Sequence, residues 1–225
     1  MPRNILILPI SILCIVILTS CAENTKESNG PFSHYQDEKM IGTVWEIADN
    51  ELVVDISEWE KRDIEGDGLN DDGYMYNAKL NKNTKIHFEN DNQATLADIK
   101  VGQKIQVNPP RNNKFEGYPN EIILLDMSFK EKYATLLSHN EVPRIVIMYN
   151  EHSPITMDLE AIMNNTATNI DGTQITYQQE YVVDFKEELE IERFPVIFVF
   201  NQEELLFKTY EEEELYEFLE SLGSE

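Results

Sequence analysis

The chain has 225 residues, 41% of them hydrophobic, with ten Tyr, ten Phe and two Trp, which is enough for a sizeable apolar core. Its formal net charge of −24 at pH 7 would repel a phosphate backbone or an anionic lipid surface, so the composition argues against nucleic acid as a partner. Cations, basic proteins and basic peptides are the charged partners that remain, although acidity would also serve solubility alone.

Residues 5–18 form an apolar run that follows Arg3 and ends in small polar residues. A membrane-spanning helix needs about 20 apolar residues, so this shorter run predicts a cleaved signal peptide over residues 1–20. Leu18-Thr19-Ser20-Cys21 resembles the lipobox of bacterial lipoproteins. The resemblance implies cleavage before Cys21, palmitate-type lipidation of its thiol, and anchorage to the extracytoplasmic face of a bacterial cell membrane. An ordinary signal peptide with an incidental cysteine is the alternative.

Cys14 and Cys21 are the two cysteines of the chain. Cys14 would leave with the signal and Cys21 would carry the lipid, so we expect a mature protein without a free thiol or a disulfide. No thiol redox activity and no cysteine-bound metal are therefore expected. Residues 21–38 are polar and predict a flexible tether.

Residues 39–130 show the pattern of a small all-β domain. Segments 41–47 and 51–56 flank turn residues 48–50 and predict a hairpin. The other expected strands are 74–80, 85–88, 103–107 and 121–125. Short strands separated by Gly, Asn and Pro predict a barrel or a sandwich.

Segment 97–107, followed by Gly117-Tyr118-Pro119 and a final strand, resembles the OB-type domain of uncharacterised Gram-positive lipoproteins. The resemblance implies an oligomer-binding barrel with no agreed ligand. Gly102 stands where such a domain turns into a strand, a position that favours a positive φ. The insertion 57–73 is not part of that pattern.

Acidic residues recur through 63–73, with glycines between them. Such spacing suits a hard cation, which collects oxygen ligands at about 2.3 to 2.6 Å. The segment resembles the calcium loops of thrombospondin type 3 and dockerin-like repeats. The resemblance implies calcium ligands at Asp63, Glu65, Asp67, Asn70 and Asp71. A solvated acidic loop is the alternative.

Residues 131–143 are expected to form a linker, and residues 144–225 a second domain of the α/β class. Its expected elements are strand 144–149, helix 156–164 with Thr156 as a cap, strand 181–185, an acidic helix or turn at 186–192, strand 194–200, strand 205–210 and helix 211–222. The last helix carries an apolar face made of Leu215, Phe218, Leu219 and Leu222.

This order of elements is similar to the thioredoxin fold. Pro195 stands where that family has a cis-proline, and His152-Ser153-Pro154-Ile155 stands at the active-site segment without either cysteine. The resemblance implies a thioredoxin-like domain without dithiol exchange, and a groove at His152, Pro154 and Pro195 that accepts extended polypeptide. An exposed loop histidine is the alternative to an acid–base role for His152.

No motif assigns a reaction to the chain. Gly-x-Ser-x-Gly, His-Glu-x-x-His and phosphate-binding loops do not occur, and His34, His87 and His139 have no metal-site spacing. We therefore expect a lipid-anchored, non-catalytic binding module for a protein, peptide or envelope ligand, with no cofactor. Two alternatives remain, namely a calcium-binding surface protein that uses loop 63–72 and an enzyme whose site the sequence does not reveal.

Overall fold

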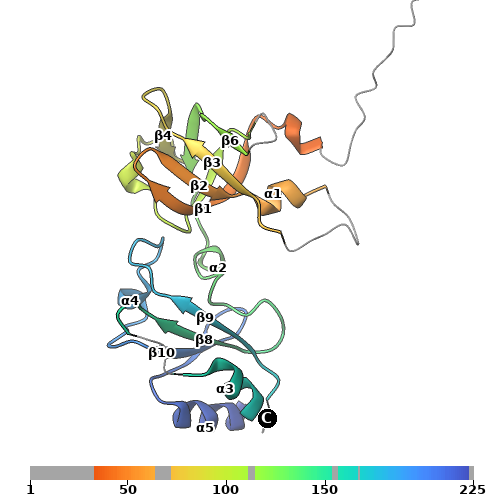
Figure 1. The fold of residues 1–225 in the computed structure, drawn as a ribbon, viewed down its shortest axis with the longest axis vertical. Helices are drawn as coiled ribbons and strands as arrows, with labels where there is room; N and C mark the ends of the chain where they lie inside the picture. Colours follow the sequence, from red (N-terminus) through yellow and green to blue (C-terminus); the bar gives the residue numbers. More distant parts are fainter. Residues whose placement is uncertain (1–32, 64–71, 111–114, 154–156, 167, 223–225) are drawn as a thin grey trace, which may run out of the picture.

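Two mixed β-sheets, one of seven strands and one of four, organise the protein. The computed structural model describes residues 33–63, 72–110, 115–153, 157–166 and 168–222. In Figure 1 the seven-stranded sheet lies above the four-stranded sheet, and helix α2 (Phe129–Lys132) lies on the connection between them. The protein is thus an α/β protein with few helices.

The first sheet has the strand order β4-β7-β5-β1-β2-β3-β6. Its strands are β1 (Met40–Ala48), β2 (Glu51–Asp55), β3 (Met75–Lys79), β4 (Lys85–Phe88), β5 (Lys104–Val107), β6 (Glu116–Gly117) and β7 (Glu121–Leu124). Neighbouring strands are antiparallel except for two parallel pairs at the ends, β4 with β7 and β3 with β6. The six strands expected in this half are confirmed within a few residues of their predicted bounds.

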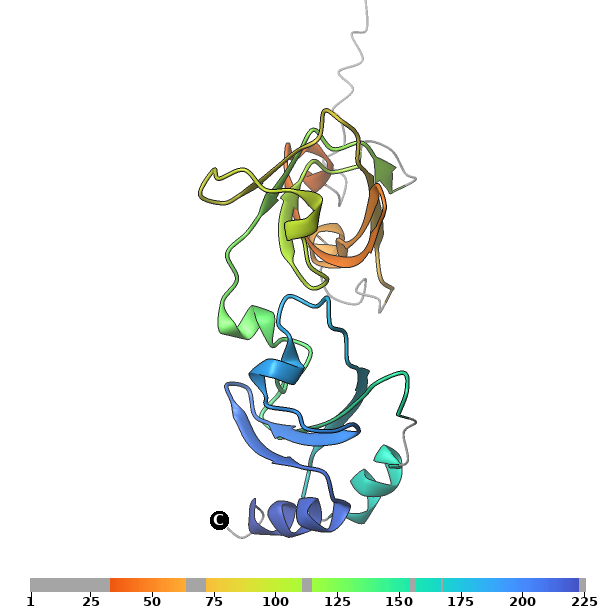
Figure 2. The same cartoon turned by 90° about the vertical axis from the view of Figure 1, so that its left-hand side faces the viewer.

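The prediction of an all-β barrel for 39–130 is only partly confirmed. The described residues form a curled mixed sheet without a closed barrel (Figure 2). They also include α1 (Ser57–Lys61) and the 3₁₀ helices η1 (Ser33–Gln36) and η3 (Leu96–Asp98). The strand at one end of this sheet, β6, has only two residues.

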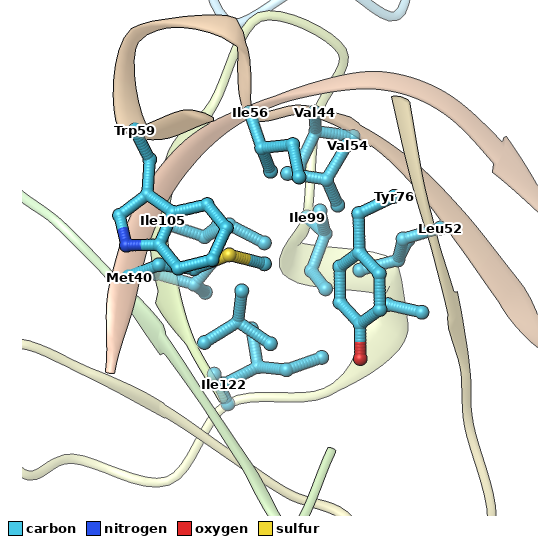
Figure 3. Packing of buried hydrophobic residues seen from close by; sticks show 14 residues of the cluster. Met40, Val44, Leu52, Val54, Ile56, Trp59, Tyr76, Ile99, Ile105 and Ile122 are labelled. Carbon is cyan, nitrogen blue, oxygen red and sulfur yellow. The ribbon is translucent and has the colours of Figure 1, made fainter. Parts of the chain in front are cut away.

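Alternate residues of the first three strands fill the core of this sheet. Met40 and Val44 of β1, Leu52 of β2 and Tyr76 of β3 are each at most 1% exposed. Trp59 of α1 packs against the same cluster, and Figure 3 shows it on the opposite side from Tyr76. Removing this apolar surface from water is the main force that holds the sheet in its curled form.

The second sheet has the strand order β11-β10-β8-β9. Its strands are β8 (Arg144–Tyr149), β9 (Asp171–Thr176), β10 (Val196–Phe200) and β11 (Leu205–Thr209). Strand β9 runs parallel to β8, whereas β10 is antiparallel to both β8 and β11. The peptide bond between Phe194 and Pro195, just before β10, is cis.

Helices cover both faces of the second sheet, which explains why β8 and β10 are buried on both sides. On one face, Ile145 and Ile147 pack with Leu215. On the other face, Val146 packs with Phe185. The covering helices are α3 (Leu159–Asn165) and α5 (Glu212–Leu222) on the first face and α4 (Phe185–Glu188) on the second, where the segment after α2 also packs.

The prediction of a strand at 181–185 is wrong. The second strand of this half is β9, an edge strand whose side chains are half-buried or exposed, so its sequence contains no apolar run. In the predicted segment, Asp184 caps α4 by accepting the backbone N–H groups of Lys186 and Glu187. The rings of Tyr181 and Phe185 stack with their centroids 5.2 Å apart.

The helix predicted for 156–164 begins later than expected. It starts at Leu159 because the Asp158 side chain accepts the N–H of Ala161 and serves as the N-cap. The predicted cap, Thr156, lies outside the described residues.

The segment 131–143, predicted as a linker, packs against the second sheet. Tyr133, Leu136 and Leu137 are buried in the core on the α4 face of that sheet. Lys104 of β5 donates to Glu131 of α2 at 2.7 Å, so the segment is also held to the first sheet. Within the described ranges, no helix combines the length and the apolar character needed to cross a bilayer.

Candidate functional site

A cleft of about 660 Å³ lies between the two sheets. Its volume falls within the range of about 300 to 1,000 Å³ that is usual for ligand pockets. Residues of the first sheet form one wall and residues at the ends of β8 and β9 form the other. The lining residues are Thr43, Val44, Trp45, Glu46, Asp55, Val101, Gly102, Thr135, Met148, Ile175, Thr176, Tyr177, Gln178, Tyr181 and Phe185.

Backbone hydrogen bonds fix the two walls of the cleft relative to each other. The N–H of Val101 donates to the carbonyl of Glu180 at 3.0 Å, and the Val101 carbonyl accepts the N–H of Val182 at 2.7 Å. The next residue, Gly102, donates its N–H to the Val44 carbonyl of β1 at 2.7 Å. Gly102 has a φ of 80°, which confirms the positive φ predicted there. The cleft is therefore formed before any ligand enters.

A β-bulge in β1 leaves two consecutive residues, Trp45 and Glu46, exposed on the outer side of the first sheet. The register between β1 and β2 shifts between Val44 and Glu46, which leaves Trp45 as the extra residue. Regular alternation would turn Glu46 inward after an outward Trp45, but the bulge leaves both side chains exposed. Trp45 is 63% exposed and lines the cleft. Its indole offers a flat apolar surface to a ligand.

The charged side chains that line the cleft are both acidic. Glu46 and Asp55 are its charged residues, and none of the described lining residues is basic. Asp55 Oδ1 accepts the backbone N–H of Ser57 at 2.9 Å and the Ser57 hydroxyl at 2.5 Å. Asp55 Oδ2 makes no hydrogen bond or ion pair with another described residue. One carboxylate oxygen of Asp55 and the whole carboxylate of Glu46 are thus available to a ligand.

The two tyrosines of the cleft stay protonated at neutral pH. Burial, followed by the hydrogen bond that the Tyr177 hydroxyl donates to Asp184 at 2.8 Å, raises the pKa of Tyr177 to about 12. Burial also raises the pKa of Tyr181, and a hydrogen bond with Thr135 lowers it in part. These rings therefore contribute aromatic surface without negative charge.

Of the five predicted calcium ligands, the structure describes Asp63. The described ligand candidate, Asp63, uses Oδ2 to accept the backbone N–H of His34 at 3.1 Å, and the same oxygen lies 2.9 Å from His34 Nδ1. Among the described residues, no group of three or more His, Cys, Asp or Glu is placed to hold a metal ion. The other predicted ligands lie outside the described residues, and they are Glu65, Asp67, Asn70 and Asp71.

The structure describes two of the three residues of the predicted peptide groove, and it leaves the groove a prediction. His152 lies in an exposed turn, where its N–H donates to Asn150 Oδ1 at 3.1 Å. Pro195 lines a different hollow, of about 460 Å³, together with Phe194 and Tyr210, and His152 is not among its described lining residues. Pro154 lies outside the described residues, as does the predicted lipidation site Cys21.

Trp45 is the site residue that sequence reasoning did not find, although the sequence contains a signal for it. Val44 and Ile47 both pack in the first core and are three residues apart. A regular strand places residues of one face at even spacing, so this odd spacing indicates a bulge between them.

The fold and the cleft define a class of protein, a two-sheet α/β protein with an acidic, aromatic-lined cleft between the sheets. Comparison with known proteins narrows this class no further, because no family model matches the chain and no curated protein matches it significantly.

Proposed function

We propose that the protein is a non-catalytic, lipid-anchored binding module on the extracytoplasmic face of a bacterial cell membrane, and that the cleft between the sheets holds its protein, peptide or envelope ligand. The observation that carries the proposal is the placement of Trp45, which lies 63% exposed in the lining of the cleft beside the bulge of β1. Tryptophan is enriched among the residues that dominate binding energy, because covering its large ring removes much apolar surface from water.

The strand orders support the finer fold assignments within this proposal. In the second sheet the order β11-β10-β8-β9, with β9 parallel to β8 and Pro195 before β10, suits a cysteine-less thioredoxin-like domain. In the first sheet β1, β2 and β3 form a meander and β1 also pairs with β5, as suits an OB-like domain that is incompletely closed. Neither fold determines a ligand, so the argument for binding rests on the cleft.

Lipid anchorage is tested by labelling cells with radioactive palmitate. The wild-type chain should carry the label and fractionate with membranes, whereas the Cys21→Ser chain should lose both properties. An unlabelled wild-type chain that retains residues 1–20 would remove the anchor from the proposal, whatever the cleft binds.

Binding by the cleft is tested separately with the Cys21→Ser chain immobilised and exposed to detergent-solubilised envelopes. We expect a retained component that free chain displaces, and whose recovery falls about tenfold on Trp45→Ala, a typical effect for a central aromatic residue. The matched control is Tyr118→Ala, because Tyr118 is 66% exposed on the same half of the protein and does not line the cleft. Equal recovery by both variants would overturn the assignment to the cleft.

A further inference from the structure

We propose that the cleft binds a lysine or arginine side chain presented by an extended polypeptide segment. The inference rests on the proposed binding function and assigns the chemical class of its ligand. It follows from three features of the cleft, namely its charge, its aromatic surface and the open sheet edge beside it.

Charge complementarity selects a cation. Glu46 and Asp55 line the cleft, and none of the described lining residues supplies a counter-charge. A neutral or anionic ligand that displaced water from these carboxylates would leave them without partners, which carries the full desolvation penalty of a charged group. A basic side chain would satisfy them instead, and the net charge of −24 would steer it toward the protein.

The aromatic surface suits the same ligand. Trp45 and Glu46 are consecutive in sequence, and the bulge leaves both of them exposed. An indole and a carboxylate are therefore neighbours in one wall of the cleft. A cation within about 6 Å of an indole face is attracted by the negative face of the ring, and more strongly when it is desolvated. Tyr177 and Tyr181 add neutral aromatic surface to the same cleft.

The chain already uses this combination of groups elsewhere. Arg193 lies over the ring of Tyr210, with Cζ 4.9 Å from the ring centroid, and its Nη2 donates to Glu211 Oε1 at 2.5 Å. An aromatic ring and a neighbouring carboxylate thus hold a guanidinium within the protein itself. The cleft also has an indole and carboxylates among its lining residues, and none of its described lining residues is a cation.

The open edge of β9 favours a polypeptide over a free amine. Strand β9 ends the sheet order and pairs on one side only, with β8, in the described part of the chain. The N–H of Tyr177 donates to the Tyr149 carbonyl of β8 at 2.7 Å, so strand alternation turns the N–H and C=O of Thr176 away from β8. Thr176 also lines the cleft. An extended segment could pair with these groups while its basic side chain reaches Glu46 and Trp45.

Two pools of fluorescein-labelled heptapeptides test the inference against the Cys21→Ser chain. Both pools have random neutral residues at six positions, and the central residue is lysine or arginine in one pool and norleucine or citrulline in the other. Fluorescence anisotropy should show at least tenfold tighter binding of the basic pool. That preference should shrink when the salt concentration is raised from 50 to 500 mM, because salt screens the carboxylates.

Glu46→Gln should weaken binding of the basic pool about fivefold to tenfold and leave binding of the neutral pool unchanged. The matched control is Asp49→Asn, which removes one charge from an exposed turn residue outside the cleft and should change binding less than twofold. Thermal unfolding of both variants checks that each is folded, which their exposed positions lead us to expect.

The outcomes separate this inference from the proposed function. Equal binding of both pools that is lost on Trp45→Ala would retain the binding module and overturn the basic ligand. Equal effects of Glu46→Gln and Asp49→Asn would overturn recognition by Glu46. Binding of spermidine as tight as that of the basic pool, and in competition with it, would overturn the extended polypeptide. No binding of either pool, while envelope recovery still depends on Trp45, would overturn the inference alone.

Discussion

Gly102 packs directly against the ring of Tyr181, and a Cβ atom placed on Gly102 would lie 2.2 Å from Tyr181 Cε2. Gly102 belongs to the turn that leads into β5, whereas Tyr181 belongs to the loop before α4. The contact therefore joins the two sheets at the cleft. A glycine is required on two grounds, the close approach of the ring and the φ of 80°.

Gly102→Ala is expected to lower the free energy of unfolding by about 2 to 4 kcal/mol, since overpacking adds to the strain of a left-handed alanine. Urea unfolding measures the loss. Gly73→Ala is the control, because a Cβ there would meet only Met75 Cε at 3.8 Å, and its effect should stay within about 0.5 kcal/mol. Equal stability of the two variants would mean that the sheets do not meet at Gly102.

The two tryptophans should differ sharply in solvent contact, because Trp45 is 63% exposed and Trp59 is 5% exposed. Trp45→Phe should therefore remove most of the emission that acrylamide quenches, and Trp59→Phe should leave that emission in place. Steady-state fluorescence with acrylamide titration measures both. Comparable quenching of the two single-tryptophan proteins would contradict the outward placement of Trp45.

His87 gives the first sheet a pH dependence whose direction follows from two opposite pKa shifts. The side-chain hydrogen bond with Glu121, and then the Phe88 carbonyl, raise the pKa of His87 above 6.5. The hydrogen bonds from Lys39 and then His87 lower the pKa of Glu121 below 4.5. The contribution of His87 is complete below pH 6.5 and is lost as the pH rises through its folded pKa. That of Glu121 is present above pH 4.5 and is lost as the pH falls through its folded pKa.

His87→Gln should therefore lower the free energy of unfolding at pH 5.5 by up to about 1 kcal/mol, the usual limit for a partly exposed ion pair, and by less at pH 8.5. Urea unfolding at the two pH values measures the difference. The exposed His139 provides the control, since His139→Gln should have the same small effect at both. A loss that does not depend on pH would show that the charge of His87 is not involved.

Helix α2 depends on a reciprocal cap between Ser128 and Glu131. The Ser128 hydroxyl accepts the Glu131 N–H at 3.3 Å, and the Glu131 carboxylate accepts the Ser128 N–H at 2.8 Å. Ser128→Ala should cost about 1 kcal/mol of unfolding free energy, measured by urea denaturation. The control Ser221→Ala removes an exposed hydroxyl that donates to the Phe218 carbonyl and should cost less than about 0.5 kcal/mol. A similar cost for both would indicate that the cap is not formed.

Prediction from the sequence succeeded where a local pattern reflects burial. The continuous apolar segment at β10 and the alternating segment at β2 are found as strands, because each pattern matches the faces that its strand buries. Prediction failed at β9, since an edge strand needs no apolar run and is recognised only by its hydrogen bonds to β8. It failed again at 181–185, where Tyr181, Val183 and Phe185 pack against the core of the second sheet without forming a strand.

The amino-acid sequence by itself determined the positions of most strands and the apolar face of α5, because each depends on neighbours close in the chain. Which residues line the cleft was decided by the tertiary structure alone. These lining residues come from the hairpin of β1 and β2, from the turn at Gly102 and from the end of β9, and these parts meet only after both sheets have formed and the hydrogen bonds of Val101 have joined them. Contacts of this kind depend on the path of the whole chain, which local periodicity does not encode.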